Sequence, residues 1–181
     1  MPHLELSEIL MMVCVAAFTA FAAVIDLRTK KIPNKLTLPL FVLGLAYQAG
    51  FHGLGGLADA GKGFLLGFGT LFVLWLIGGG GGGDAKLMGA LSVWLGWRWT
   101  FWVLVLSTLF VLVGTLAVMV YSVIAKGAYK TKNKYIYSSD KNKGQPETIA
   151  QRQKRRIMTY ALPVALATWV VLLWVHLKPG V

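Results

Sequence analysis

The sequence has 181 residues, of which 56% are hydrophobic and 14% are charged, and its mean hydropathy is +0.65. A soluble domain of this size cannot bury so much apolar surface, so most of the chain is expected to lie in lipid. The single cysteine, Cys14, excludes an internal disulfide and a four-cysteine zinc site. In a membrane protein, a net charge of +11 reports orientation and contact with anionic lipid rather than nucleic-acid binding, and no nucleic-acid partner is expected.

Six apolar segments are candidates for membrane helices, since about 20 residues cross a bilayer. They cover residues 6–25, 36–51, 63–77, 87–95, 100–124 and 157–177. The fourth is short, because about nine helical residues rise only about 14 Å. Pro163 falls one turn inside the sixth and is expected to kink it. We therefore predict an all-α, polytopic membrane protein with about six transmembrane helices, forming a single membrane-embedded domain over residues 1–181.

The basic residues indicate how these helices are oriented. If the loop after the first helix, the turn around Lys86 and the stretch 125–156 are cytoplasmic, that side holds 15 of the 18 Lys and Arg residues. The positive-inside rule then places both termini on the non-cytoplasmic side. With this orientation, the stretch 125–156 is predicted to be a basic cytoplasmic loop, in which a helix begins near Pro146. Its basic cluster either docks anionic lipid or a partner, or only fixes the topology.

Two of the seven acidic residues, Asp26 and Asp84, stand at the cytoplasmic ends of apolar helices. A carboxylate near hydrocarbon is costly and indicates a functional site. Two carboxylates at one membrane depth can share a proton, so that one activates a water while the other polarises a carbonyl group. Alternatively, an aspartate at a helix end is an ordinary solvated cap. This alternative suits Asp26 better than Asp84, because six glycines, 78–83, directly precede Asp84.

The surroundings of both aspartates resemble those of one protein family. Gly81-Gly82-Gly83-Asp84 fits the G-x-G-D signature of intramembrane aspartyl proteases, and residues 83–87 resemble the GDxKL form of the type IV prepilin peptidases. A second group of residues resembles the first catalytic block of that family, namely Asp26, Ile32, Pro33 and Asn34. The resemblance covers about residues 13–96.

The resemblance implies a membrane endopeptidase of the bacterial inner membrane that removes the basic leader of type IV prepilins or pseudopilins at the cytoplasmic face. Asp26 and Asp84 would be the catalytic pair, acting without a metal or another cofactor. The substrate would be a membrane-inserted helix with a basic leader. Supporting roles would fall to the remaining motif residues, namely Gly81 and Gly83 in the conformation of the motif, Ile32, Pro33 and Asn34 in the turn into the second helix, and Lys86.

For Lys86 two interpretations stay open: a cation that favours an ionised Asp84, or an ordinary interfacial lysine. Larger family members carry paired cysteines in an extra cytoplasmic region and also N-methylate the new pilin terminus. This chain resembles instead the short, peptidase-only type of tight-adherence (Flp) pilus systems, so no methyltransferase activity is expected.

The main alternative function is a transporter or channel subunit that uses the two aspartates as proton or cation ligands. A non-catalytic scaffold is another, and the oligomeric state is not indicated.

Overall fold

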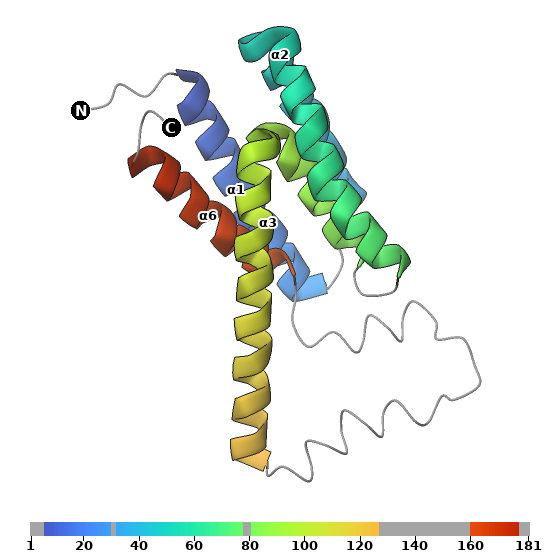
Figure 1. Ribbon diagram of the computed structural model, residues 1–181, viewed down its shortest axis with the longest axis vertical. Coiled ribbons are helices and arrows are strands. Elements are labelled where there is room, and N and C mark those ends of the chain that lie inside the picture. Colours follow the sequence, from blue (N-terminus) through green and yellow to red (C-terminus); the bar gives the residue numbers. More distant parts are fainter. Residues whose placement is uncertain (1–5, 30–31, 78–80, 127–159, 178–181) are drawn as a thin grey trace. The chain divides into compact units, whose positions relative to one another are not determined.

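The computed structural model describes residues 6–29, 32–77, 81–126 and 160–177. The elements in these ranges are α-helices, with no strand among them: α1 (Leu6–Thr29), α2 (Asn34–Leu76), α3 (Gly82–Lys126) and α6 (Ala161–Leu177) (Figure 1). The prediction of an all-α chain is confirmed. The predicted basic loop falls outside the described residues except for its first two, 125 and 126, which belong to α3. The helix start predicted near Pro146 also falls outside them.

Two glycines divide α2 and α3 into halves. Gly53 (φ 60°, ψ −148°) and Gly96 (φ 70°, ψ 179°) have non-helical backbone that side chains with a Cβ rarely adopt. The halves of α3, residues 82–95 and 97–126, contain the two segments predicted there. The second half of α2 begins earlier than predicted, directly after Gly53, because residues 54–62 are helical as well.

Within the described ranges, three stretches are long and apolar enough to cross a membrane: α1, α2 and Gly82–Tyr121 of α3. The helix α6 is shorter, with 17 residues. We treat the chain as a multi-pass membrane protein, while the count of six spans and the orientation of the termini stay predictions. The prediction of a kink at Pro163 was wrong. Because α6 begins at Ala161, the proline lies in the first turn, where its missing N–H removes no helical hydrogen bond.

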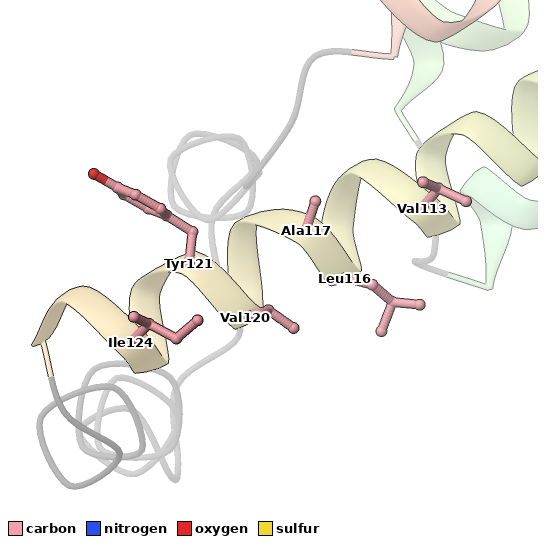
Figure 2. Close-up of a pocket in the computed structure, with 6 residues that line it drawn as sticks. All are labelled: Val113, Leu116, Ala117, Val120, Tyr121 and Ile124. Carbon is pink, nitrogen blue, oxygen red and sulfur yellow. The ribbon is translucent and has the colours of Figure 1, made fainter.

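The chain divides into two compact units. The first contains Met1–Thr108 and Thr159–Val181, and the second contains Leu109–Met158. The described part of the second unit is the end of α3, where six side chains line an open apolar pocket: Val113, Leu116, Ala117, Val120, Tyr121 and Ile124 (Figure 2). None of the predicted site residues lines this pocket. The predicted site residues all lie in the first unit.

Within the first unit, α1 and α6 pack side by side and run in opposite directions (Figure 1). Near the middle of α1, Thr19 Oγ1 accepts a hydrogen bond of 3.1 Å from Trp169 Nε1 of α6. Around this bond, both helices bury small and branched side chains that allow a close approach, namely Val15 and Ala22 of α1 and Val164, Ala167 and Val171 of α6. This packing brings the last turn of α1 to the first turn of α6.

The first half of α3 packs against both halves of α2. Gln48 Nε2 donates hydrogen bonds to the carbonyl oxygens of Val93 (3.1 Å) and Trp94 (3.2 Å). These are among the last carbonyls before the break at Gly96, where a helix end leaves such groups without helical partners. On the other side, a Cβ at Gly67 of α2 would overlap Ser92 Oγ, so only glycine permits this approach. The half-helix that begins with the Asp84 motif is thus held near its far end, at residues 92–94.

Candidate active site

Asp26 lies in the last turn of α1 and is only 2% exposed. Its Oδ2 accepts a hydrogen bond of 3.2 Å from the backbone N–H of Ala161, the first residue of α6. The C-terminal end of a helix disfavours a negative charge, whereas the N-terminal end favours it. The start of α6 therefore supplies the stabilisation that α1 cannot give to this carboxylate. A solvated cap would be exposed, so the burial of Asp26 argues against that alternative.

Asp84 lies in the first turn of α3 and is 6% exposed. Its Oδ2 accepts a hydrogen bond of 3.3 Å from the N–H of Gly81. In return, the carbonyl of Gly81 accepts hydrogen bonds from the N–H groups of Asp84 (3.0 Å) and Ala85 (3.3 Å). The bond from the Gly81 N–H to the Asp84 side chain is one half of a capping box, and the bonds to the Gly81 carbonyl are the first bonds of the helix. The motif aspartate thus defines where α3 begins, and its charge lies at the favourable end of its own helix.

The segment Tyr160–Ala161 contacts Asp26 and is within the electrostatic influence of Asp84. Ala161 donates its N–H to Asp26, while burial and, to a smaller extent, the negative charge of Asp84 raise the pKa of the Tyr160 hydroxyl. The Tyr160 hydroxyl is also 3.2 Å from Ser107 Oγ in the second half of α3. Asp26 and Asp84, 58 positions apart in the sequence (84 minus 26), are thus both linked to the start of α6.

Sequence reasoning missed Tyr160 and Ser107. The only signal in the sequence was their polarity within the apolar segments 157–177 and 100–124. A single hydroxyl in such a segment is common, and it did not mark a site without the contacts that the fold provides.

The two motif blocks also contact each other. Lys86 Nζ donates a hydrogen bond of 3.0 Å to Asn34 Oδ1, and both residues are exposed. A Cβ placed on Gly83 would lie 3.6 Å from the Cβ of Ile32, which is buried. Pro33 directly precedes α2, and its carbonyl accepts hydrogen bonds from the N–H groups of Leu36 (3.0 Å) and Thr37 (3.4 Å). The block after Asp26 and the block around Asp84 are thus joined at the starts of α2 and α3.

The end of the glycine run has ordinary space around it. Gly81 is non-helical, while Gly82 and Gly83 form the first turn of α3. A Cβ at Gly82 would meet Trp75 at 3.5 Å, an ordinary van der Waals distance. Crowding therefore does not require glycine at positions 82 and 83.

Among the side chains that the structure describes, no group of three or more His, Cys, Asp or Glu could hold a metal ion.

Residues 13–123 match the model of the type IV leader peptidase family. The chain belongs to this family. The match begins within α1 and ends near the end of α3, so it includes both aspartates and both motif blocks. The family that the motifs predicted is therefore confirmed.

Several curated relatives of this type IV leader peptidase family member are named prepilin leader peptidase/N-methyltransferase. The protein of Escherichia coli (strain K12) is 40% identical over 99 residues, which are 51% of this chain and 44% of the relative. The protein of Aeromonas hydrophila is 43% identical over 94 residues, 47% of this chain and 31% of the relative. The protein of Dickeya chrysanthemi is 36% identical over 94 residues, which are 48% of this chain and 32% of the relative. The matches thus span less than half the length of these relatives. No solved structure matches the chain significantly.

Proposed function

We propose that this chain is a membrane aspartyl endopeptidase that cleaves the basic leader peptide from type IV prepilins or pseudopilins. The observation that carries the proposal is the burial of two carboxylates, Asp26 and Asp84, whose motif blocks contact each other through Lys86 and Asn34. Family membership and the names of the relatives support the same activity and substrate class. They do not favour the transporter alternative.

The proposed chemistry needs only the two carboxyl groups and a water. Two close carboxylates resist double ionisation, so the pair holds one proton. The ionised member takes a proton from the water, whose oxygen attacks the scissile carbonyl carbon. The protonated member gives its proton to the carbonyl oxygen, forming a neutral tetrahedral intermediate. As this intermediate collapses, the C–N bond breaks, the protonated member gives its proton to the leaving nitrogen, and the ionised member takes a proton from a hydroxyl of the intermediate. The pair thus returns to its starting state without a covalent enzyme intermediate.

We further propose that the active site lies at the cytoplasmic face of the bacterial inner membrane, in a single domain with about six spans and both termini on the other side. The supporting observation is that the segments assigned to the cytoplasm hold 15 of the 18 Lys and Arg residues. The first half of α3, residues 82–95, is about 21 Å long, shorter than the roughly 30 Å hydrocarbon core. Asp84 at its start would then lie in a water-filled recess or under a locally thinned membrane.

We also propose that cleavage proceeds without N-methylation. The resemblance associates methyl transfer with paired cysteines, and Cys14 is the only cysteine among these 181 residues. This part of the proposal is separate from the peptidase activity, since the names of the relatives include both activities. Mass spectrometry of the processed pilin measures it directly, because each added methyl group increases the mass of the new N-terminus.

The test is leader cleavage of a co-expressed prepilin, measured by gel shift, for the wild type, Asp26→Asn and Asp84→Asn. Glu8→Gln, in the first turn of α1 and exposed, is the matched control because it removes an acid at the opposite end of the same helix. We expect both Asn variants to insert normally and lose processing, while the control processes normally. Processing that survives in either Asn variant would contradict the two-aspartate mechanism.

A further inference from the structure

Four tryptophans lie close to the break in α3 and to the end of α6. Trp174 is in the last turn of α6, and its ring packs edge to face against the rings of Trp99 (6.0 Å between centroids) and Trp102 (5.8 Å). Trp97 directly follows Gly96, at the start of the second half of α3, and is exposed. These four residues form what we call the tryptophan cluster. The proposed chemistry uses none of them.

The indole N–H groups distinguish this cluster from two other tryptophans of the fold. Trp94 donates its N–H to the Leu40 carbonyl at 2.9 Å. Trp169 donates its N–H to Thr19 Oγ1 at 3.1 Å. In the part of the chain that the structure describes, no member of the cluster donates its N–H to another residue. Exposure does not explain the difference, because Trp169 and Trp174 are both 41% exposed.

The N–H groups of the cluster indicate what its members contact. Hydrocarbon offers no acceptor, so an indole N–H placed there would stay unsatisfied at a cost in free energy. At the interface between lipid and water, headgroup oxygens and water accept this hydrogen bond while the ring contacts acyl chains. The cluster therefore fits the headgroup region, whereas Trp169, whose N–H is bonded within the protein, fits the hydrocarbon.

Charged groups beside the cluster support the same depth. Arg98, between two members of the cluster, is exposed. The Asp59 carboxylate lies so close to Gly96 that a Cβ on this glycine would overlap it. Because charges are costly in hydrocarbon, the end of the first unit that carries them belongs near the membrane surface. Two independent features, the indole N–H groups and these charges, thus place this end at the interface.

The helices give the distance from the cluster to the aspartates. Ala161, which binds Asp26, lies 13 residues before Trp174, or about 20 Å along α6. The first half of α3 extends about 17 Å from Asp84 to Leu95, next to the break. The hydrocarbon core is about 30 Å thick, and tilt only reduces the depth that a helix covers. With the cluster at one surface, both carboxylates lie about 10 Å short of the other.

We infer that the tryptophan cluster binds the phospholipid headgroup region of the bilayer and sets the depth of both aspartates from the opposite side. The partner is the lipid interface itself, because the cluster needs oxygen acceptors for its N–H groups and acyl chains for its rings. A change in bilayer thickness is then absorbed at the aspartate end and not at the cluster. The inference goes beyond the proposed function, and its test measures depth without cleavage, so either can fail while the other stands.

The test is spin labelling of the full-length protein in phosphatidylcholine bilayers of increasing acyl-chain length. In a Cys14→Ala background, nitroxides are attached to Phe101→Cys, within the cluster, and to Leu166→Cys of α6, two positions of similar exposure (47% and 44%). Collisions with oxygen and with a water-soluble nickel chelate report the depth of each label. We expect the label at position 101 to lie at the headgroups in every bilayer, and the label at position 166 about 10 Å deeper. Equal depths, or a label at position 101 that sinks as the bilayer thickens, would overturn the inference.

A double variant, Trp97→Phe with Trp102→Phe, tests the N–H groups themselves, because it keeps two aromatic rings. With it, the label at position 101 should sink as the bilayer thickens. Trp169→Phe is the matched control, since this tryptophan is as exposed as Trp174 but bonds to Thr19. It should lower stability and leave the depth of the label unchanged. A double variant that keeps the depth of its parent, or a control that shifts it equally, contradicts the inference, and the two labels in the parent protein decide it even where the double variant does not fold.

Discussion

Replacing Gln48 by leucine tests how the half-helix that begins at Asp84 is held. The Gln48 side chain is 6% exposed and binds the carbonyls of Val93 and Trp94, which are 1% and 3% exposed. Leucine fills a similar volume but leaves both carbonyls without this donor. An unsatisfied buried acceptor costs about 1–3 kcal/mol, and hydrogen bonds within membrane proteins average about 0.6 kcal/mol. We take about 1 kcal/mol per bond, a value between these two. Losing both bonds should then lower the free energy of unfolding by about 2 kcal/mol.

The assay is unfolding of the detergent-solubilised protein by increasing SDS, followed by the helical circular dichroism signal. A loss of about 2 kcal/mol corresponds to roughly a thirtyfold change in the unfolding equilibrium. Ala49→Leu is the control, because it introduces the same side chain at the next position, which is exposed. If Gln48→Leu were as stable as this control, the two hydrogen bonds would not support the break in α3, and our explanation of the break would be wrong.

Two further predictions concern the helix break and the contact between the motif blocks. Gly96→Ala should destabilise the protein by about 1–3 kcal/mol, because φ 70° with ψ 179° is accessible almost only to glycine and the new Cβ would overlap the Asp59 carboxylate; an unchanged thermal unfolding midpoint would refute this. For Asn34→Ala and Lys86→Met, a double-mutant cycle on the unfolding free energy should show a coupling of about 0.5 kcal/mol, since their 3.0 Å hydrogen bond is exposed. Strictly additive effects would mean that this bond does not join the two blocks.

The helices could be predicted from the sequence because apolar runs and glycines are local signals. Residues 36–51 end where Gly53 breaks α2, and residues 87–95 end where Gly96 breaks α3. The helical stretch 54–62 was missed because its glycines and its Asp59 and Lys62 lower its hydropathy. Its packing compensates for this composition, since small residues such as Gly56 and Ala60 are buried there. Hydropathy alone does not report such contacts.

The site, like the helices, could be predicted from the sequence only in part. Asp26 and Asp84 were identifiable because carboxylates are rare beside apolar helices, and their motifs have recognisable spacing. The contacts of Tyr160 with Ser107 and of Ala161 with Asp26 could not be predicted, since they join residues 53 and 135 positions apart. Such pairs depend on how α6 packs against α1 and α3, and no local pattern encodes that packing.

The two carboxylates lie at opposite ends of their own helices, yet each accepts a hydrogen bond from a backbone N–H at the start of a helix, and this arrangement determines how substitutions at the site can be interpreted. Asp84 is favoured by its own helix, whereas Asp26 depends on the N–H of Ala161 at the start of α6. Asparagine at either position keeps a carbonyl oxygen that can accept the same backbone hydrogen bond, and it removes a buried charge that is costly in an apolar environment. The Asn variants therefore retain the contact that joins α1 to α6 while losing the group that could carry the proton. Loss of cleavage in a folded Asn variant consequently measures the chemistry of the carboxylates and not their contribution to packing.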